Sequence, residues 1–342
     1  MARQLNGEDT TMTALAVKKN KTVTRFLLDW AAVITLGLCF AIFTAIKGSS
    51  FMSSNNMINI LRAMSITTVF GIAATMTMST DGFDMSMCTL ASCSAYVFVS
   101  MYLWYGMPLA MAIAVSILVT MIMYQLTMFL ILVCKIPDML ATASLMFVHQ
   151  GLGQWYIGGG AVSTGMRLPN GSAPARTALS DSFSAIGRAP WIIIIMLLCV
   201  LAAYVFLEHT KHGRYMYAMG GNKQAARLSG INVKYYRYLA GMITAVFIAI
   251  GGILVASRGS SAQVMNSDGY LMQSLAAVFV GRSVGGAEKP NALGTLVGAM
   301  LVSTLENGLT ILAVSYYVLP AVKGGVLALA LIAAYAGKKE NN

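Results

Sequence analysis

The chain has 342 residues, of which 57% are hydrophobic and only 10% are charged, with 23 Lys and Arg against 12 Asp and Glu. Soluble domains carry about 25% charged residues, so this composition excludes a water-facing surface over most of the chain. A net charge of +11 would suggest nucleic-acid binding in a soluble protein, but membrane proteins collect basic residues in their cytoplasmic loops. We therefore predict an all-α integral membrane protein.

The expected elements begin with a polar segment, residues 1–25, which lacks the apolar core of a secretory signal peptide and is predicted to be a cytoplasmic tail. About 20 apolar residues cross a bilayer as a helix. By that measure we expect about ten transmembrane helices in a single domain, 26–337, and a cytoplasmic tail at 338–342. The apolar runs lie at 27–46, 64–79, 87–104, 108–134, 139–156, 191–208, 237–256, 270–281, 292–312 and 317–336.

Two of these runs, 64–79 and 270–281, are short for a full crossing. Each ends in a polar segment that contains glycine, at 79–82 and 281–282 respectively. Interrupted apolar segments of this kind indicate broken helices beside a transport path.

Basic residues set the expected orientation, because Lys and Arg are enriched on the cytoplasmic side. With ten spans, three basic clusters fall on one side, which leaves the irregular segment 157–190 outside. Three arginines in that segment, Arg167, Arg176 and Arg188, count mildly against this orientation. The clusters comprise Lys18, Lys19, Lys21 and Arg25; Lys211, Arg214, Lys223, Arg227, Lys234 and Arg237; and Lys338 and Lys339.

The loop 213–233 is predicted to contain a short helix between two breakers. Gly220 and Gly221 are expected to turn the chain, Asn222 is a good N-cap, and 223–229 can form about two turns. Gly230 suits the left-handed conformation that follows a helix end.

Three residues of that short helix give it an apolar patch that could enter a groove on a partner. The alternative is an ordinary basic loop whose Lys and Arg side chains lie at the lipid headgroups. The patch comprises Ala225, Ala226 and Leu228.

This loop closely resembles the cytoplasmic loop of ribose-type ABC permeases, in which the pattern is GR-x-x-x-A-x-GGN-x-x-AARLSGI. In that family the loop contacts the ATPase subunit and transmits its motion. The resemblance therefore implies an ATPase-coupling site. The matching residues are Gly213, Arg214, Ala218, Gly220, Gly221, Asn222, Ala225, Ala226, Arg227, Leu228, Ser229, Gly230 and Ile231.

Other segments extend the resemblance from about residue 50 to 335, and it implies an ABC importer permease fold. Segment 51–61 is similar to FLT-x-x-N-x-x-NIL, and 80–87 is similar to GGIDLSVG. The chain departs from the family at Asp81 and Cys88, which replace glycines of that second motif, and at Arg282, which replaces a glycine after Gly281. The remaining matches are 261–263, 269–270, 294–299, 307–309 and 322–324.

Asp84, Ser86 and Glu306 are the candidates for the transport pathway. An ionisable residue inside a span is costly and is therefore a functional candidate, and carboxylates and serine can bind sugar hydroxyls. The alternative for Asp84 is a local role, since an aspartate at a helix start complements the helix dipole. For Glu306 the alternative is an interfacial position.

No enzyme signature is present. The sequence lacks the P-loop pattern G-x-x-x-x-G-K-[ST], so we predict that this chain is a transport subunit without ATPase activity. Its five cysteines form no metal-ligand spacing, and we predict no metal and no cofactor in this chain.

The resemblance places ATP and Mg²⁺ on a separate ATPase subunit. It also implies a second permease subunit, identical or different, and a periplasmic or extracellular sugar-binding protein. The implied location is the bacterial inner membrane, with both termini cytoplasmic. The implied function is uptake of a monosaccharide or related small polar solute, driven by ATP hydrolysis on that partner.

Three alternative functions remain open from the sequence. An ion- or proton-coupled secondary transporter would use Asp29, Asp84 or Glu306, none of which has an evident partner in the sequence. A permease that does not transport, within a heterodimer, fits the same motifs. An intramembrane enzyme would need motifs that are missing.

Overall fold

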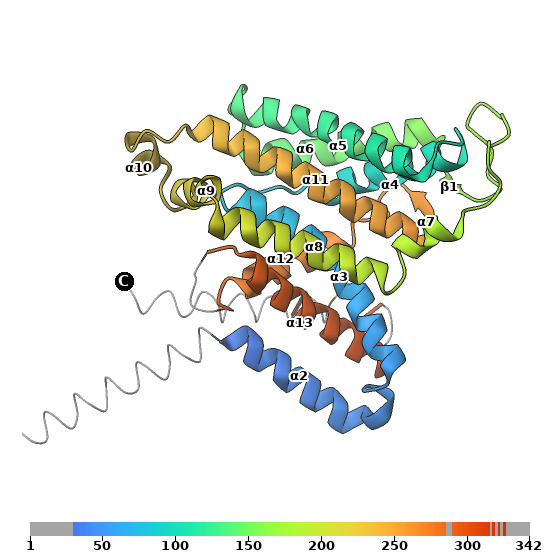
Figure 1. Ribbon diagram of the computed structural model, residues 1–342, viewed down its shortest axis with the longest axis horizontal. Helices are drawn as coiled ribbons and strands as arrows, with labels where there is room; N and C mark the ends of the chain where they lie inside the picture. The colour runs from blue at the N-terminus through green and yellow to red at the C-terminus, as the bar shows by residue number, and fades with distance from the viewer. Residues whose placement is uncertain (1–29, 285–288, 315–316, 319–320, 322–323, 326–342) are drawn as a thin grey trace, which may run out of the picture.

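The computed structural model describes residues 30–284, 289–314, 317–318, 321 and 324–325. Its main helices lie side by side along one axis (Figure 1). They are α2 (Ala31–Lys47), α3 (Ser54–Met78), α4 (Met87–Leu103), α5 (Leu109–Leu132), α6 (Asp138–Ile157), α8 (Trp191–Tyr204), α11 (Val233–Gly259), α12 (Tyr270–Gly281) and α13 (Ala292–Ile311). The shorter ones are η1 (Gly48–Ser50), α7 (Asp181–Ile186), η2 (Val205–His209), α9 (Lys211–Gly221) and α10 (Lys223–Leu228).

The two ends of the bundle differ, and we call them the α10 end and the β1 end (Figure 1). At the β1 end, β1 (Ala161–Ser163) pairs antiparallel with β2 (Ser261–Gln263), with Val162 opposite Ala262. The segment 157–190 is therefore more ordered than its composition predicted. It also contains α7, whose fully buried Phe183 stacks on Phe98 with ring centroids 4.7 Å apart.

Six of the described helices are long and apolar enough to cross a membrane. The predicted count of about ten is thus not confirmed by helix length and composition. Two more apolar helices, α4 and α12, are shorter. The expected tails and most of the last apolar run, 317–336, lie outside the described residues. The six are Ala31–Ser50, Ser54–Met78, Leu109–Leu132, Trp191–His209, Val233–Gly259 and Ala292–Ile311.

The second apolar run is not short, and that prediction was wrong. Helix α3 has 25 residues because it begins at Ser54, upstream of the apolar stretch. Its polar start is stabilised locally: the hydroxyl oxygen of Ser53 accepts a hydrogen bond from the Asn56 N–H at 3.3 Å. The Asn56 amide in turn donates to the Phe51 carbonyl at 2.8 Å. Helix α12, with 12 residues, is short as predicted.

Helices α3 and α11 form the centre of the bundle and are mostly buried, whereas α2 lies at its edge. Helix α11 packs against α3, α4 and α5, and α12 packs against α13 and α3. Hydroxyl pairs join neighbouring helices, as is common where lipid leaves packing and hydrogen bonds to drive association. They are Thr75 with Thr295 at 2.7 Å, Thr77 with Thr244 at 2.9 Å, and Ser94 with Ser116 at 2.7 Å.

Candidate functional site

The segment 211–232 projects from the α10 end as two short helices, α9 and α10 (Figure 1). Gly220 and Gly221 do not turn the chain as predicted; they are the last residues of α9. The chain turns at Asn222, whose side-chain oxygen accepts hydrogen bonds from the N–H groups of Gln224 and Ala225, both at 3.0 Å. The predicted N-cap is confirmed, and it fixes where α10 begins.

The end of α10 is fixed by Gly230, which has a positive φ of 82° as predicted. Its N–H donates to the Arg227 carbonyl at 3.1 Å, and the Ile231 N–H donates to the Ala226 carbonyl at 3.0 Å. This pair of bonds is the Schellman arrangement, which needs a left-handed residue just past the helix. Glycine adopts that conformation without a steric cost.

The exposed face of α10 differs from the predicted apolar patch. Leu228 is 90% exposed, and Ala225 and Arg227 are also exposed. Ala226 is only 4% exposed and packs against the protein's own core. Ala226 therefore holds α10 on the bundle, and the part of the predicted patch left for a partner is Ala225 and Leu228, with Arg227 between them in the sequence.

Helix α9 approaches the end of α3 closely. A Cβ added to Gly220 would lie 2.4 Å from the Ser79 carbonyl oxygen, whereas one added to Gly221 would meet open space. Gly213, at the other end of α9, is similarly tight, because its Cβ would lie 2.2 Å from the Leu207 carbonyl oxygen. Gly213 and Gly220 thus let α9 pack against backbone, and Gly221 has no such role.

The segment that follows α3, residues 79–86, lies directly against α9 and α10. Lys223 at the start of α10 forms a salt bridge with Asp81, with Nζ 3.2 Å from the carboxylate. Asp81 has a positive φ of 57°, a conformation that glycine adopts freely and aspartate tolerates. Both side chains are substantially exposed, so this pair alone contributes about 0–1 kcal/mol.

A buried arginine anchors the same segment from the other side. Arg237, in the second turn of α11, donates to the Thr77 carbonyl at 3.1 Å and to the Thr80 hydroxyl at 2.7 Å, and it pairs with Asp138. Gly82 leaves the space for its guanidinium, since a Cβ there would lie 1.7 Å from Nη1. The sequence presents Arg237 as one more loop cation. The sequence signal that could have indicated its role is its position at the first residue of an apolar run, 237–256.

A second contact ties α9 to the start of α13. Lys289 lies 3.2 Å from the Glu208 carboxylate and 3.9 Å from the centroid of the Tyr217 ring. The Tyr217 hydroxyl lies 3.1 Å from the Glu208 carboxylate and 2.9 Å from the Pro290 carbonyl. Burial raises the pKa of Tyr217, so the hydroxyl stays a neutral donor. The sequence did not single out this cluster.

Of the three pathway candidates, the structure brings Asp84 and Ser86 together, whereas Glu306 has a different partner. Asp84 is 4% exposed, and its Oδ1 accepts hydrogen bonds from the N–H and the hydroxyl of Ser86, both at 2.8 Å, at the start of α4. Glu306 accepts a hydrogen bond from Gln273 at 3.0 Å, between α13 and the start of α12. No cluster of His, Cys, Asp and Glu suited to a metal ion occurs among the described residues.

Comparison with known proteins decides the family. Residues 56–335 match the family described as branched-chain amino acid transport system / permease component. The chain is 30% identical to the ribose import permease protein of Escherichia coli over 329 residues, which cover 94% of this chain and 98% of that protein. The chain belongs to this permease family. This confirms the resemblance drawn from the motifs, to the permease component of ABC importers of the ribose type.

Further relatives are also permease proteins of sugar transport systems. The chain is 30% identical to the ribose import permease of Haemophilus influenzae, over 94% of this chain and 99% of that protein. It is 24% identical to the D-allose transport system permease of Escherichia coli, over 88% of this chain and 91% of that protein. The permease therefore matches these proteins along nearly its whole length.

Proposed function

We propose that this permease imports a monosaccharide or a related polyhydroxylated solute, and that α10 connects it to a separate ATPase subunit at the cytoplasmic face. Relatives named for ribose, xylose and D-allose support the substrate class. The observation that carries the coupling role is the exposed Leu228 on a helix fixed at both ends, by Asn222 and by Gly230.

The proposed topology has about ten spans, with the α10 end in the cytoplasm. The 79–86 and 211–232 segments share that end, and β1 pairs with β2 at the other, as alternating crossings require. Two of the arginines in 157–190 are engaged within their own surroundings. Arg176 donates to the Gly106 carbonyl at 2.9 Å and lies 4.2 Å from the Tyr102 ring centroid, and Arg167 donates to the Gly171 carbonyl. These two arginines therefore have structural partners, and the orientation rests on the larger number of basic residues at the α10 end.

In this proposal the permease works as a dimer with the pathway between its subunits, and a binding protein delivers the solute from outside. ATP binding closes the ATPase pair and moves α10. Contacts of α9 and α10 with segment 79–86 and with Lys289 carry that motion to α3, α4 and α13. Asp84 and Ser86 lie on this route at the start of α4, whereas Glu306 lies farther along α13, beside Gln273 of α12.

The test is uptake of radiolabelled ribose, xylose and allose into proteoliposomes that contain the permease, its ATPase and its binding protein. We expect uptake only with internal ATP and with both partners present. Leu228→Asp should abolish stimulation of the ATPase while the permease stays folded. Uptake that follows an imposed proton or sodium gradient, without ATP, would overturn the proposal in favour of a secondary transporter.

Topology is tested separately by cysteine labelling. A cysteine introduced at Lys223 should react with a membrane-impermeant maleimide in inverted vesicles but not in intact cells. The chain has five native cysteines, which could also react. Lys223→Cys is therefore introduced into a variant in which those five residues are replaced by serine, and this one protein is labelled in both preparations. Rapid labelling of Lys223→Cys from outside would reverse the orientation.

A further inference from the structure

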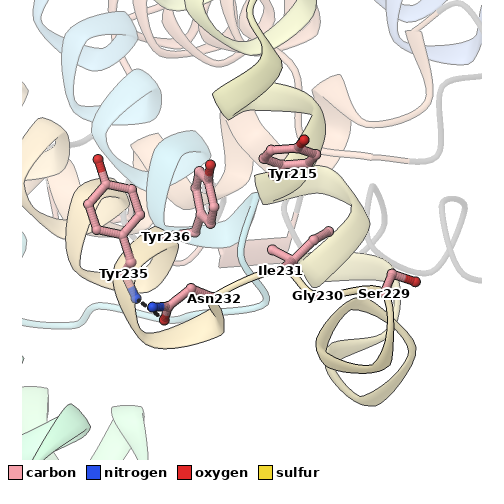
Figure 2. A pocket seen from close by; sticks show the side chains of 7 residues that line it. All are labelled: Tyr215, Ser229, Gly230, Ile231, Asn232, Tyr235 and Tyr236. Atoms are coloured by element: carbon pink, nitrogen blue, oxygen red, sulfur yellow. Dashed lines mark hydrogen bonds between the residues drawn. The ribbon is translucent and has the colours of Figure 1, made fainter.

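A pocket of about 510 Å³ opens beside α10 (Figure 2). One side is formed by the residues that leave α10, and the other by aromatic rings from α9 and from the first turn of α11. Its lining is therefore amphipathic, with tyrosine faces and hydroxyls and one amide. The lining residues are Tyr215, Ser229, Gly230, Ile231, Asn232, Tyr235 and Tyr236.

The rings of this pocket are held in place by one another. Tyr236 is 9% exposed, and its ring meets Tyr215 edge-on at 5.3 Å and Tyr235 edge-on at 5.1 Å between centroids. Asn232 fixes the turn beneath them, since its side-chain oxygen accepts a hydrogen bond from the Tyr235 N–H at 3.1 Å (Figure 2). Tyr215 and Tyr235 remain 40% and 50% exposed. Exposed tyrosine on a rigid frame is typical of the residues that dominate binding energy at interfaces.

The chain segment that supplies the pocket residues is positively charged. The sequence has no Asp or Glu between Glu208 and Asp268. Four exposed cations on this segment form no salt bridge among the described residues. Unpaired charges of one sign at an interface favour a partner of the opposite sign. The four are Lys211, Arg214, Arg227 and Lys234.

We propose that this pocket is the receiving half of a two-way contact with the ATPase subunit. Leu228 enters the ATPase, and a projecting apolar or aromatic side chain of the ATPase, flanked by carboxylates, enters the pocket. The pocket follows α10 directly, at Ser229–Asn232, so a partner that covers Leu228 also covers it. This inference rests on the proposed function, because it assumes that α10 faces an ATPase.

The experiment measures the affinity of the purified ATPase subunit for the permease in phosphatidylcholine nanodiscs. Truncation of a hot-spot residue costs more than about 1 kcal/mol, so Tyr215→Ala and Tyr235→Ala should each weaken binding by roughly fivefold or more. Ser229→Trp, which fills the pocket from its rim, should do the same. The matched control is Tyr238→Ala: Tyr238 is 38% exposed on the same helix, but it hydrogen-bonds Gln125 and does not line the pocket.

The charged rim is tested in the same assay. Wild-type affinity should fall as NaCl rises, and Arg214→Gln should flatten that dependence, because screening acts on exposed charges. An affinity that does not change with salt would contradict an acidic partner surface.

The outcomes separate the two proposals. If Leu228→Asp abolishes ATPase binding while Tyr215→Ala, Tyr235→Ala and Ser229→Trp bind as the wild type does, the pocket inference is wrong and the coupling role stands. If Leu228→Asp also binds normally, the coupling role of α10 fails. If the tyrosine variants change only thermal stability in phosphatidylglycerol nanodiscs, the pocket is a lipid-headgroup site, which overturns the inference.

Discussion

Lys223 and Asp81 join α10 to the segment that follows α3, with the ammonium nitrogen 3.2 Å from the carboxylate. Asp81 has a positive φ. It stands where the motif GGIDLSVG, which this segment resembles, has its first glycine. The chain thus combines a glycine-like backbone with an added charge. Two opposing effects on stability therefore act at Asp81: the strain of the positive φ destabilises the fold, and the exposed ion pair with Lys223 stabilises it.

Substitutions at Asp81 separate those two effects, because Asp81→Gly and Asp81→Val both remove the charge. Asp81→Gly also removes the strain of a positive φ, so its stability should stay within about 1 kcal/mol of the wild type, the upper value of an exposed pair. Asp81→Val places a β-branched residue at that φ and should lose about 1–3 kcal/mol. Unfolding in detergent, followed by intrinsic fluorescence, measures both. Equal losses would mean that the ion pair, and not the backbone, dominates.

Gly220 and Gly221 are adjacent yet should respond differently to alanine. Gly220→Ala sets a methyl group against the Ser79 carbonyl, where the space is 2.4 Å, and should destabilise α9 packing by about 1–3 kcal/mol. Gly221→Ala meets open space at the last residue of a helix and should be neutral or stabilising by up to about 1 kcal/mol. Uptake should fall with Gly220→Ala alone. Similar melting temperatures for both variants would show that α9 does not press on Ser79.

Arg237 and Asp138 should behave as one unit. Removing the guanidinium leaves the partly buried Asp138 carboxylate without its cation, although the Phe83 N–H still donates to it, so Arg237→Met should cost about 3–5 kcal/mol. Asp138→Asn in the Arg237→Met background removes the unpaired charge and should recover part of the loss. A double-mutant cycle on unfolding free energies measures the coupling. Additive losses would show that the two side chains do not interact.

The local features of the coupling segment were predictable, but its contacts were not. Asn222 and Gly230 act within a few residues, so residue type alone indicates a helix start and a left-handed end. The burial and the contacts of Arg237 could not be predicted, because its partners Asp138 and Thr77 lie 99 and 160 positions away in the sequence. The start of α3 was missed because hydrogen bonds at Ser53 and Asn56 stabilise polar residues that carry no apolar signal.

The direction in which Ala226 points also depends on tertiary packing, since a helix of six residues has no periodicity to read. Ala225 and Ala226 are neighbours of the same type, but only Ala226 is buried. The pair therefore offers a matched comparison of one buried and one exposed position on α10.

Ala226→Trp should force α10 away from its own bundle, because overpacking a buried site costs about 1–3 kcal/mol. Ala225→Trp should leave α10 in place and instead obstruct the ATPase, weakening its binding by about tenfold, or 1.4 kcal/mol. Limited trypsin cleavage after Arg227 reports the position of α10, since a helix that has left the bundle is cut faster. We expect faster cleavage for Ala226→Trp and the wild-type rate for Ala225→Trp, with ATPase affinity reduced in both. The reverse pattern of cleavage would mean that α10 presents its other face to the bundle, and that Ala226 rather than Ala225 meets the ATPase.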